Sequence, residues 1–162
     1  MQGRPRRSVL YMPGSNERAL EKAKTIPADA LIFDLEDSVA PDAKALARDQ
    51  VSAAVRNGGY GGREIVIRVN ALETPWGTDD LLAACAAAPD AILVPKVVHS
   101  GDIISVAKIL QGAHAPEARR RRDADALGQR DIGHASVLLQ VAQDAEIDAV
   151  ELDPGHGTFP LV

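Results

Sequence analysis

Four times along its first 112 residues, the chain passes from a short apolar run through a polar turn into a helix-like segment. The apolar runs, rich in β-branched residues, predict strands at 8–12, 30–37, 64–69 and 91–94. Repeated strand and helix alternation implies right-handed crossovers and a parallel sheet. The runs do not alternate between apolar and polar residues, as is typical of strands buried on both faces. The sequence therefore predicts an α/β fold built from parallel βα repeats.

Composition allows an ordinary enzyme domain. The 162 residues are 46% hydrophobic, which is enough for one core. A net charge of -5 argues against a non-specific nucleic-acid or anionic-membrane partner. No apolar stretch reaches the ~18 residues that span a bilayer, and the basic start lacks the apolar core of a signal peptide. Cys85 is the only cysteine, which excludes an intramolecular disulfide and a cysteine metal cluster. A cytoplasmic location is the default expectation.

Three carboxylates, Asp34, Glu36 and Asp37, directly follow the apolar run 30–33. In parallel α/β proteins, ligands bind at the carboxyl ends of the strands, where loops carry polar groups. Three like charges this close repel one another and call for a cation or an arginine nearby. Alternatively, one carboxylate caps the next helix and the others face water, because Asp is a favoured cap and turn residue.

The other strand ends carry polar or turn-forming residues as well: Pro13 and Gly14, then Arg68 and Asn70, then Lys96. If the strands are adjacent and parallel, all of these lie at one end of the sheet. The acidic cluster beside two cations would suit a small anionic substrate and Mg2+, which prefers oxygen ligands. The Arg68 guanidinium could grip a carboxylate with two hydrogen bonds. The alternatives are a structural salt bridge for Arg68 and a solvated or bridging role for Lys96.

Four segments, 7–16, 31–39, 67–70 and 92–97, resemble in order and spacing the citrate lyase beta subunit-like proteins of the HpcH/HpaI aldolase superfamily. The resemblance covers roughly residues 4–112. It implies a (β/α)8 TIM barrel that binds Mg2+ and acts on a CoA thioester. The reaction implied is aldol-type cleavage or formation of a carbon-carbon bond, between an oxo acid and an acyl thioester of the citryl-CoA or malyl-CoA kind. It also implies a homo-oligomer if the barrel is complete.

The resemblance also implies roles for individual residues. Arg68 matches the arginine that contacts the substrate, with Glu36 and Asp37 beside it as catalytic candidates. Asp34, Glu36 and Asp37 match the acidic stretch that supports the metal, through bound waters. The substrate-binding candidates are Arg68, Lys96, Pro13, Gly14 and Asn70, with the first strand and its loop near the phosphate region of the thioester cofactor.

After about residue 115 the resemblance lapses. The family's two direct metal ligands, a Glu in a Met-Ile-Glu-Thr-like strand and an Asp in the following unit, are not found. No β-branched strand is expected where the fifth should be, and the short apolar stretches 137–141 and 148–152 could form a helix turn or a strand. The sequence predicts βα units over 1–112 and a divergent, poorly ordered segment over 113–162. Within that segment the weaker candidates for anion binding, metal binding or catalysis are the arginines at 119–122, His134, Glu151, Asp153 and His156.

Three functions remain open. The first is a Mg2+-dependent carbon-carbon lyase. The second is a truncated or frame-disrupted member that is catalytically inactive or serves as a binding module, since a barrel of this type usually needs ~250 residues. The third is a half-barrel that pairs with another half, because an incomplete barrel leaves strand edges open.

Overall fold

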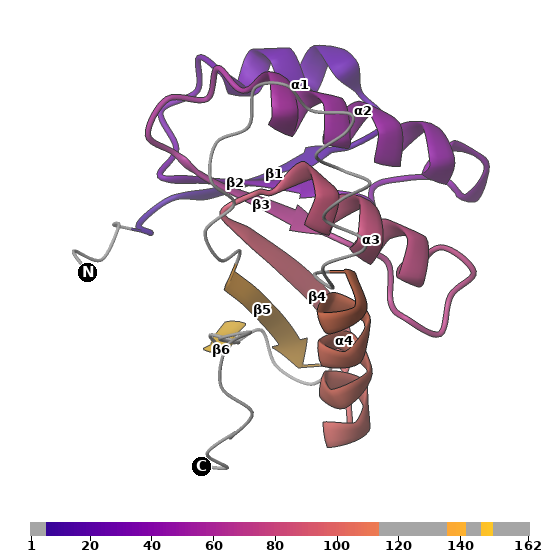
Figure 1. Cartoon of the computed structure of the whole chain (residues 1–162). Helices are drawn as coiled ribbons and strands as arrows, with labels where there is room; N and C mark the ends of the chain where they lie inside the picture. The colour runs from indigo at the N-terminus through magenta and orange to yellow at the C-terminus, as the bar shows by residue number, and fades with distance from the viewer. Residues whose placement is uncertain (1–5, 114–135, 142–146, 151–162) are drawn as a thin grey trace.

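The computed structural model describes residues 6–113 in full and the backbone of 136–141 and 147–150 (Figure 1). Helices and strands alternate along the chain, as the apolar runs predict. The strands are β1 (Val9–Pro13), β2 (Ala30–Asp34), β3 (Glu64–Arg68), β4 (Ala91–Val97), β5 (Ser136–Val141) and β6 (Ile147–Val150). The helices are α1 (Glu17–Ala23), the 3-10 turn η1 (Pro41–Ala43), α2 (Lys44–Asn57), α3 (Gly77–Ala87) and α4 (Ser100–Ala113).

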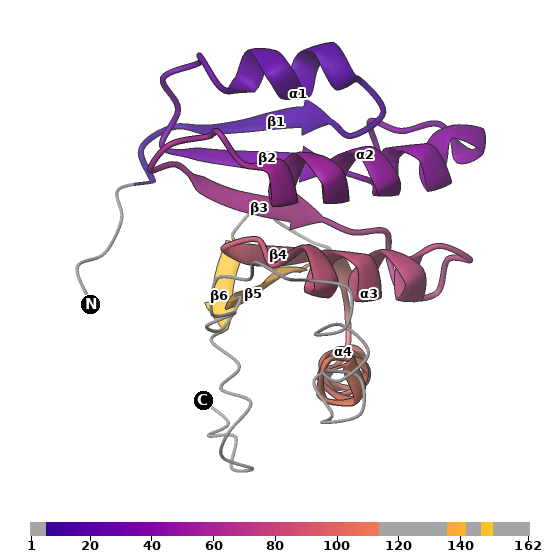
Figure 2. The ribbon, with the colours of Figure 1, turned by 45° about the horizontal axis from the view of Figure 1, so that its top comes forward.

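The six strands form one sheet in sequence order, β1-β2-β3-β4-β5-β6. Strands β1 to β5 are parallel, and β6 runs antiparallel to β5. Each new strand is added at the same edge of the sheet. With right-handed crossovers, all connecting helices therefore pack on the same face of the sheet. Figure 2 shows α1, α2 and α3 following one another along one side of the sheet. A doubly wound sheet would reverse its strand order, so this arrangement confirms the predicted resemblance to the first half of a (β/α)8 barrel.

Strands β2 and β3 and most of β4 are buried on both faces, which explains their continuous apolar runs, whereas β1 exposes Val9 and Tyr11. Side chains on the helix side form the main core, with strand residues such as Phe33 and Ile67 packed among helix residues such as Val51 and Leu81. The opposite face carries a second, smaller apolar cluster. Its members come from three neighbouring strands: Ile32, Val66, Ala91 and Leu93.

Local signals account for several element boundaries. The Asn16 side chain caps α1 by accepting a hydrogen bond from the Ala19 amide. Pro41 opens the 3-10 turn before α2, where its missing N–H is no loss. Gly58, at φ +65°, ends α2 in a backbone conformation that suits glycine.

Strand β5 decides between two alternatives. No β-branched fifth strand was expected, and the short apolar run 137–141 was left open as a helix turn or a strand; residues 136–141 form a strand that pairs in parallel with β4. The other predictions for this part of the chain, at 119–122, His134, Glu151, Asp153 and His156, lie outside the described residues, and the division at residue 112 stays a prediction. Within the described residues, no helix combines the length and apolar character needed to cross a membrane.

Candidate active site at the carboxyl ends of the strands

Asp34 and Arg68 form the centre of the site. They are direct neighbours across β2 and β3, each at the last position of its strand. The Arg68 Nε and Nη2 atoms donate to the two carboxylate oxygens of Asp34, both at 2.8 Å. Both side chains are buried. A two-pronged bond of this kind orients the guanidinium as well as neutralising it.

The position of this pair follows from the strand register. Ile32 and Val66 lie two residues earlier on the same strands and belong to the smaller apolar cluster. Successive side chains alternate between faces, so Asp34 and Arg68 stand on the face of that cluster. This face is therefore apolar in its middle and charged where the strands end.

Backbone amides complete the setting of Asp34. The amides of Glu36 and Ser38 donate to its two carboxylate oxygens at 2.8 and 3.0 Å. Burial alone would raise the pKa of Asp34, but the hydrogen bonds from Arg68 and Ser38 outweigh it and lower the pKa to about 2. Burial likewise opposes the charge of Arg68, and its bonds to Asp34 raise its pKa above the ordinary value. The pair is ionised at neutral pH.

Glu36, Asp37 and Lys96 surround the remaining side of the guanidinium. Arg68 Nη1 lies 3.2 Å from Glu36 and 3.3 Å from Asp37, longer than its contacts with Asp34. The Lys96 ammonium lies 2.8 Å from the second oxygen of Glu36, and this contact raises the pKa of Lys96. The side chains of Asp37 and Lys96 are 68% and 61% exposed. Asp37 and Lys96 are thus the exposed charged groups of the site, whereas Arg68 is buried.

Strand β4 is irregular where it carries Lys96. The pairing with β5 shifts register between Val94 and Val97, as at a β-bulge. Lys96 itself has φ +57°, in the left-handed region that non-glycine residues rarely adopt. Strained backbone of this kind concentrates at functional sites. Here the irregular backbone belongs to Lys96, whose side chain contacts Glu36 in the loop that follows β2.

The three carboxylates do not cap a helix, so the alternative raised by the sequence was wrong on that point. Neither η1 nor α2 has a side-chain cap bond. Asp37 does face water in part, as that alternative expected. The salt-bridge alternative for Arg68 is confirmed: Nε and Nη2 contact Asp34, and Nη1 contacts Glu36 and Asp37.

Three further predicted substrate-binding residues lie nearby. Pro13 pairs in register with Asp34, and the Gly14 amide donates to the Asp34 carbonyl at 2.9 Å. A Cβ at Gly14 would lie 2.7 Å from that carbonyl oxygen, so the close approach requires glycine. Asn70 is buried, and its amide nitrogen donates to the Leu35 carbonyl and to Asp80. Their predicted roles in substrate binding stay predictions.

Three residues of the site escaped the sequence reasoning. The Tyr11 ring lies 5.0 Å from the Arg68 guanidinium carbon, within range of a cation–π contact. Lys44 and Asp80 are buried and bond to groups beneath the acidic loop. Tyr11 could have been found from the sequence, since it lies two residues before Pro13 on β1 and side chains two apart share one face of a strand. Lys44 and Asp80 lie in the first turns of α2 and α3, and no local sequence pattern indicates that such charged residues are buried.

The residues present do not fit a directly bound metal ion. Both carboxylate oxygens of Asp34 already accept hydrogen bonds from Arg68 and from backbone amides, and the Glu36 carboxylate contacts Arg68 and Lys96. Among the residues that the structure describes, no three His, Cys, Asp or Glu side chains are grouped to hold a metal. That Asp34, Glu36 and Asp37 support a metal through waters remains a prediction.

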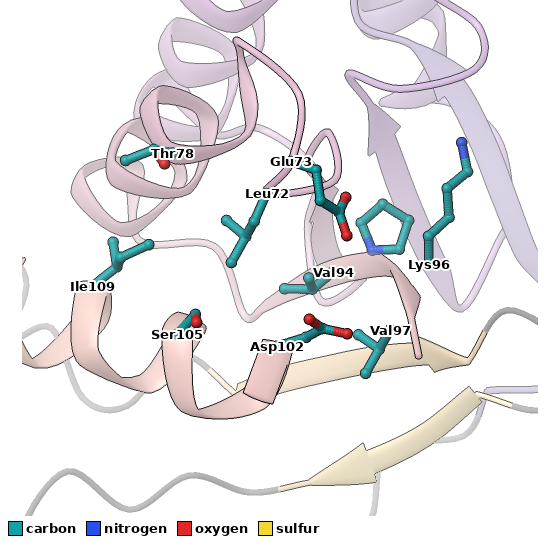
Figure 3. A pocket seen from close by; sticks show the side chains of 10 residues that line it. Leu72, Glu73, Thr78, Val94, Lys96, Val97, Asp102, Ser105 and Ile109 are labelled. Atoms are coloured by element: carbon teal, nitrogen blue, oxygen red, sulfur yellow. The ribbon is translucent and has the colours of Figure 1, made fainter. Parts of the chain in front are cut away.

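A shallow pocket lies beside the site, between β4, α3 and α4 (Figure 3). Leu72, Val94 and Ile109 supply apolar walls, and Glu73 and Asp102 supply carboxylates. Asp102 already accepts hydrogen bonds from the amides of Val98 and His99. Lys96 also lines this pocket, and in Figure 3 its side chain points away from Ile109; its ammonium contacts Glu36 of the acidic loop.

Comparisons with known proteins agree with this geometry. The family model for HpcH/HpaI aldolase/citrate lyase matches residues 7–151. A (3S)-malyl-CoA thioesterase of Cereibacter sphaeroides is 50% identical over 109 residues, which cover 67% of this chain and 38% of the relative. Citrate lyase subunit beta of Escherichia coli K12 is 41% identical over 105 residues, covering 65% and 35%. The chain thus spans less than two fifths of the length of these relatives.

Among solved structures, the citrate lyase beta subunit of M. tuberculosis complexed with oxaloacetate and magnesium aligns with a TM-score of 0.53 and 25% identity, covering 84% of this chain and 48% of that one. The Mycobacterium tuberculosis protein CitE in complex with magnesium and acetate gives 0.55 and 25%, covering 82% and 43%. The agreement of fold, motifs and family model leads to one conclusion. The chain belongs to the HpcH/HpaI aldolase/citrate lyase family.

Proposed function

We propose that the chain contributes the substrate-binding half of a site for Mg2+-dependent cleavage or formation of a carbon-carbon bond in a CoA thioester of the malyl-CoA or citryl-CoA kind. The supporting observation is the Arg68 guanidinium, held on two atoms by Asp34 and presenting Nη1 beside exposed Lys96. Relatives named as a malyl-CoA thioesterase and a citrate lyase subunit support the thioester class.

The geometry suggests how an anion is held. The contacts of Nη1 with Glu36 and Asp37 are the longest that Arg68 makes, so an incoming oxo-acid oxygen displaces them at least cost. Lys96 then approaches the same anion from β4. Two cations fixed next to the reacting carbons stabilise the negative charge that develops as the bond breaks. Mg2+, if held by groups outside the described residues, would supply Lewis-acid polarisation of the oxo acid.

Calorimetry with Mg2+ on the purified chain, with and without oxaloacetate, tests the proposal. We expect binding in the millimolar range or tighter when both are present, and weaker binding in Arg68→Lys, which cannot form the two-pronged bond. The matched control is Arg56→Lys, near the end of α2 and far from the strand ends. If no heat of binding is detected at millimolar Mg2+ and oxaloacetate, the proposed enzymatic function of this chain is excluded.

The type of reaction can be separated by its products. A malyl-CoA substrate that undergoes carbon-carbon cleavage releases an oxo acid and an acyl-CoA, whereas thioester hydrolysis releases free CoA thiol. A carbonyl reagent detects the first outcome and a thiol reagent the second. We expect carbonyl product to form first and free thiol to lag behind.

A binding module without catalysis is the second candidate. It is favoured because Asp34 and Glu36 are both engaged by cations. Oxaloacetate binding that does not depend on Mg2+, with no turnover, would support it. A half-barrel partner is the third candidate, since among the described strands β1 pairs with β2 alone and so forms one edge of the sheet. A well-folded monomer in size-exclusion chromatography with light scattering would remove that candidate.

A further inference from the structure

Lys44 is a buried cation for which the proposed chemistry has no use. It is the first residue of α2, and its ammonium lies beneath the loop that follows β2. Its Nζ atom donates to the carbonyl oxygens of Leu35 at 2.8 Å and Glu36 at 2.6 Å, and to Asn70 Oδ1 at 2.7 Å. An ammonium has three hydrogens, so these contacts use all of its donors.

The contact of Lys44 with the Leu35 carbonyl is linked through one peptide group to Asp34. The Leu35 carbonyl and the Glu36 amide belong to the same peptide group. The carbonyl accepts from Lys44, and the amide donates to Asp34 at 2.8 Å. Asp34 in turn holds Arg68 with both oxygens. Hydrogen bonds in such a chain polarise one another, so the ammonium strengthens the bond that the peptide makes to Asp34.

The far side of Lys44 is equally constrained. Asn70 donates to the Leu35 carbonyl at 2.7 Å and to Asp80 at 2.6 Å, and Arg48 donates to the other oxygen of Asp80 at 2.7 Å. Burial lowers the pKa of Lys44, and the charges of nearby carboxylates, including Asp34 and Asp80, oppose that effect. Lys44 is therefore anchored from α3 while it holds the loop.

We propose that Lys44 is a positioning residue for the pair of Asp34 and Arg68. Its ammonium fixes the peptide between Leu35 and Glu36 so that the amide faces Asp34, and Asp34 then keeps Arg68 Nη1 directed at the ligand. The ligand belongs to the proposed function, but the alignment of Arg68 is a property of the free chain. The two can therefore be tested apart.

The test compares Lys44→Met with Lys24→Met in the full chain. Lys24 is the matched control, because it too lies near an aromatic ring, 5.7 Å from Tyr60 against 5.5 Å between Lys44 and Trp76. Its ion pair with Glu21 lies on the surface of α1. The measurement is hydrogen exchange of the Arg68 Nε–H by nuclear magnetic resonance, with the signal assigned from its loss in Arg68→Lys.

We expect exchange of the Arg68 Nε–H to be about tenfold faster in Lys44→Met, the effect of losing roughly one charge-assisted hydrogen bond. The amides of core strand residues such as Phe33 keep their protection, which separates positioning from a general loss of stability. Lys24→Met leaves the Arg68 signal unchanged. In Lys44→Ala, added propylammonium restores slow exchange by refilling the three-oxygen cradle.

Unchanged exchange of the Arg68 signal in a folded Lys44→Met variant would overturn the proposal. So would a uniform acceleration of all core amides, which would mean a structural role alone. If Lys44→Met does not fold, Lys44→Gln replaces it, since its neutral amide still donates to one carbonyl. None of these readouts needs a ligand, so failure of oxaloacetate binding in the unmodified chain counts against the proposed function only.

Discussion

Replacing Asp34 by Asn tests the central pair of the site. Asn keeps the size of the side chain and removes its charge, so Arg68 loses both charged acceptors of its fork. Removing one partner of a buried ion pair typically costs about 3–5 kcal/mol, because the remaining charge stays buried. Glu36 and Asp37 remain within 3.3 Å of Nη1 and offset part of this cost. We expect the free energy of unfolding at pH 7 to fall by about 3 kcal/mol.

The pH dependence gives an independent magnitude. The pKa of Asp34 falls from 3.8 to about 2 on folding, a difference that corresponds to about 2 kcal/mol. Because the folded pKa is depressed, this stabilisation is complete above pH 4 and is lost as the pH falls towards 2. Asp34→Asn lacks it at every pH. The gap in unfolding free energy between the two proteins therefore narrows by about 2 kcal/mol across that window.

Urea denaturation followed by circular dichroism at several pH values measures both quantities. Asp42→Asn, on the exposed η1 turn, is the control for loss of a carboxylate. If Asp34→Asn does not fold, the double variant with Arg68→Met answers the same question, because it removes both buried charges and is expected to be more stable than Asp34→Asn. A gap that stays constant from pH 5 to pH 2, or a double variant whose losses simply add, would refute the reasoning.

Three other substitutions probe the frame around the pair. Gly14→Ala places a Cβ 2.7 Å from the Asp34 carbonyl oxygen, and urea denaturation should show a loss of about 1–3 kcal/mol. Asn16→Ala removes the cap of α1, and the same measurement should show a loss of about 1 kcal/mol, whereas Asn16→Asp should retain most of the stability. At Lys96, with φ +57°, Gly should be more stable than Ala by about 1 kcal/mol in thermal or urea unfolding, while both lose affinity for oxaloacetate in calorimetry. Equal stability of the two Lys96 variants would contradict the strained backbone.

The sequence could predict β1 to β4 because each strand is a short apolar run between clear turn signals. The fifth strand could not be predicted in the same way. Residues 136–141 are a short apolar run, and periodicity alone does not separate such a run from a piece of buried helix. Their pairing with β4 depends on backbone hydrogen bonds between segments far apart in the chain. Local patterns do not contain that information.

The site was predictable as a collection of residues but not as an arrangement. Parallel strands imply that Asp34, Arg68 and Lys96 lie at one end of the sheet. Only the register shows that Asp34 and Arg68 face each other directly, which turns a cluster of charges into one two-pronged bond. The left-handed backbone at Lys96 follows from an irregular pairing with β5, which the residue type does not indicate.

Two lysines contact Glu36, one at its backbone carbonyl and the other at its carboxylate, and their environments give them different roles. Lys44 is buried and bonds to the Glu36 carbonyl, together with two other oxygens. Lys96 is exposed and contacts only the Glu36 carboxylate among the ion pairs that the described residues form with it. The ion pair of Lys96 has one exposed partner, and exposed ion pairs are worth about 0–1 kcal/mol, whereas stripping a buried ammonium of three acceptors costs several times more. The proposed function therefore places the ligand between Lys96 and Arg68 Nη1, while Lys44 and Asp34 keep the guanidinium in place.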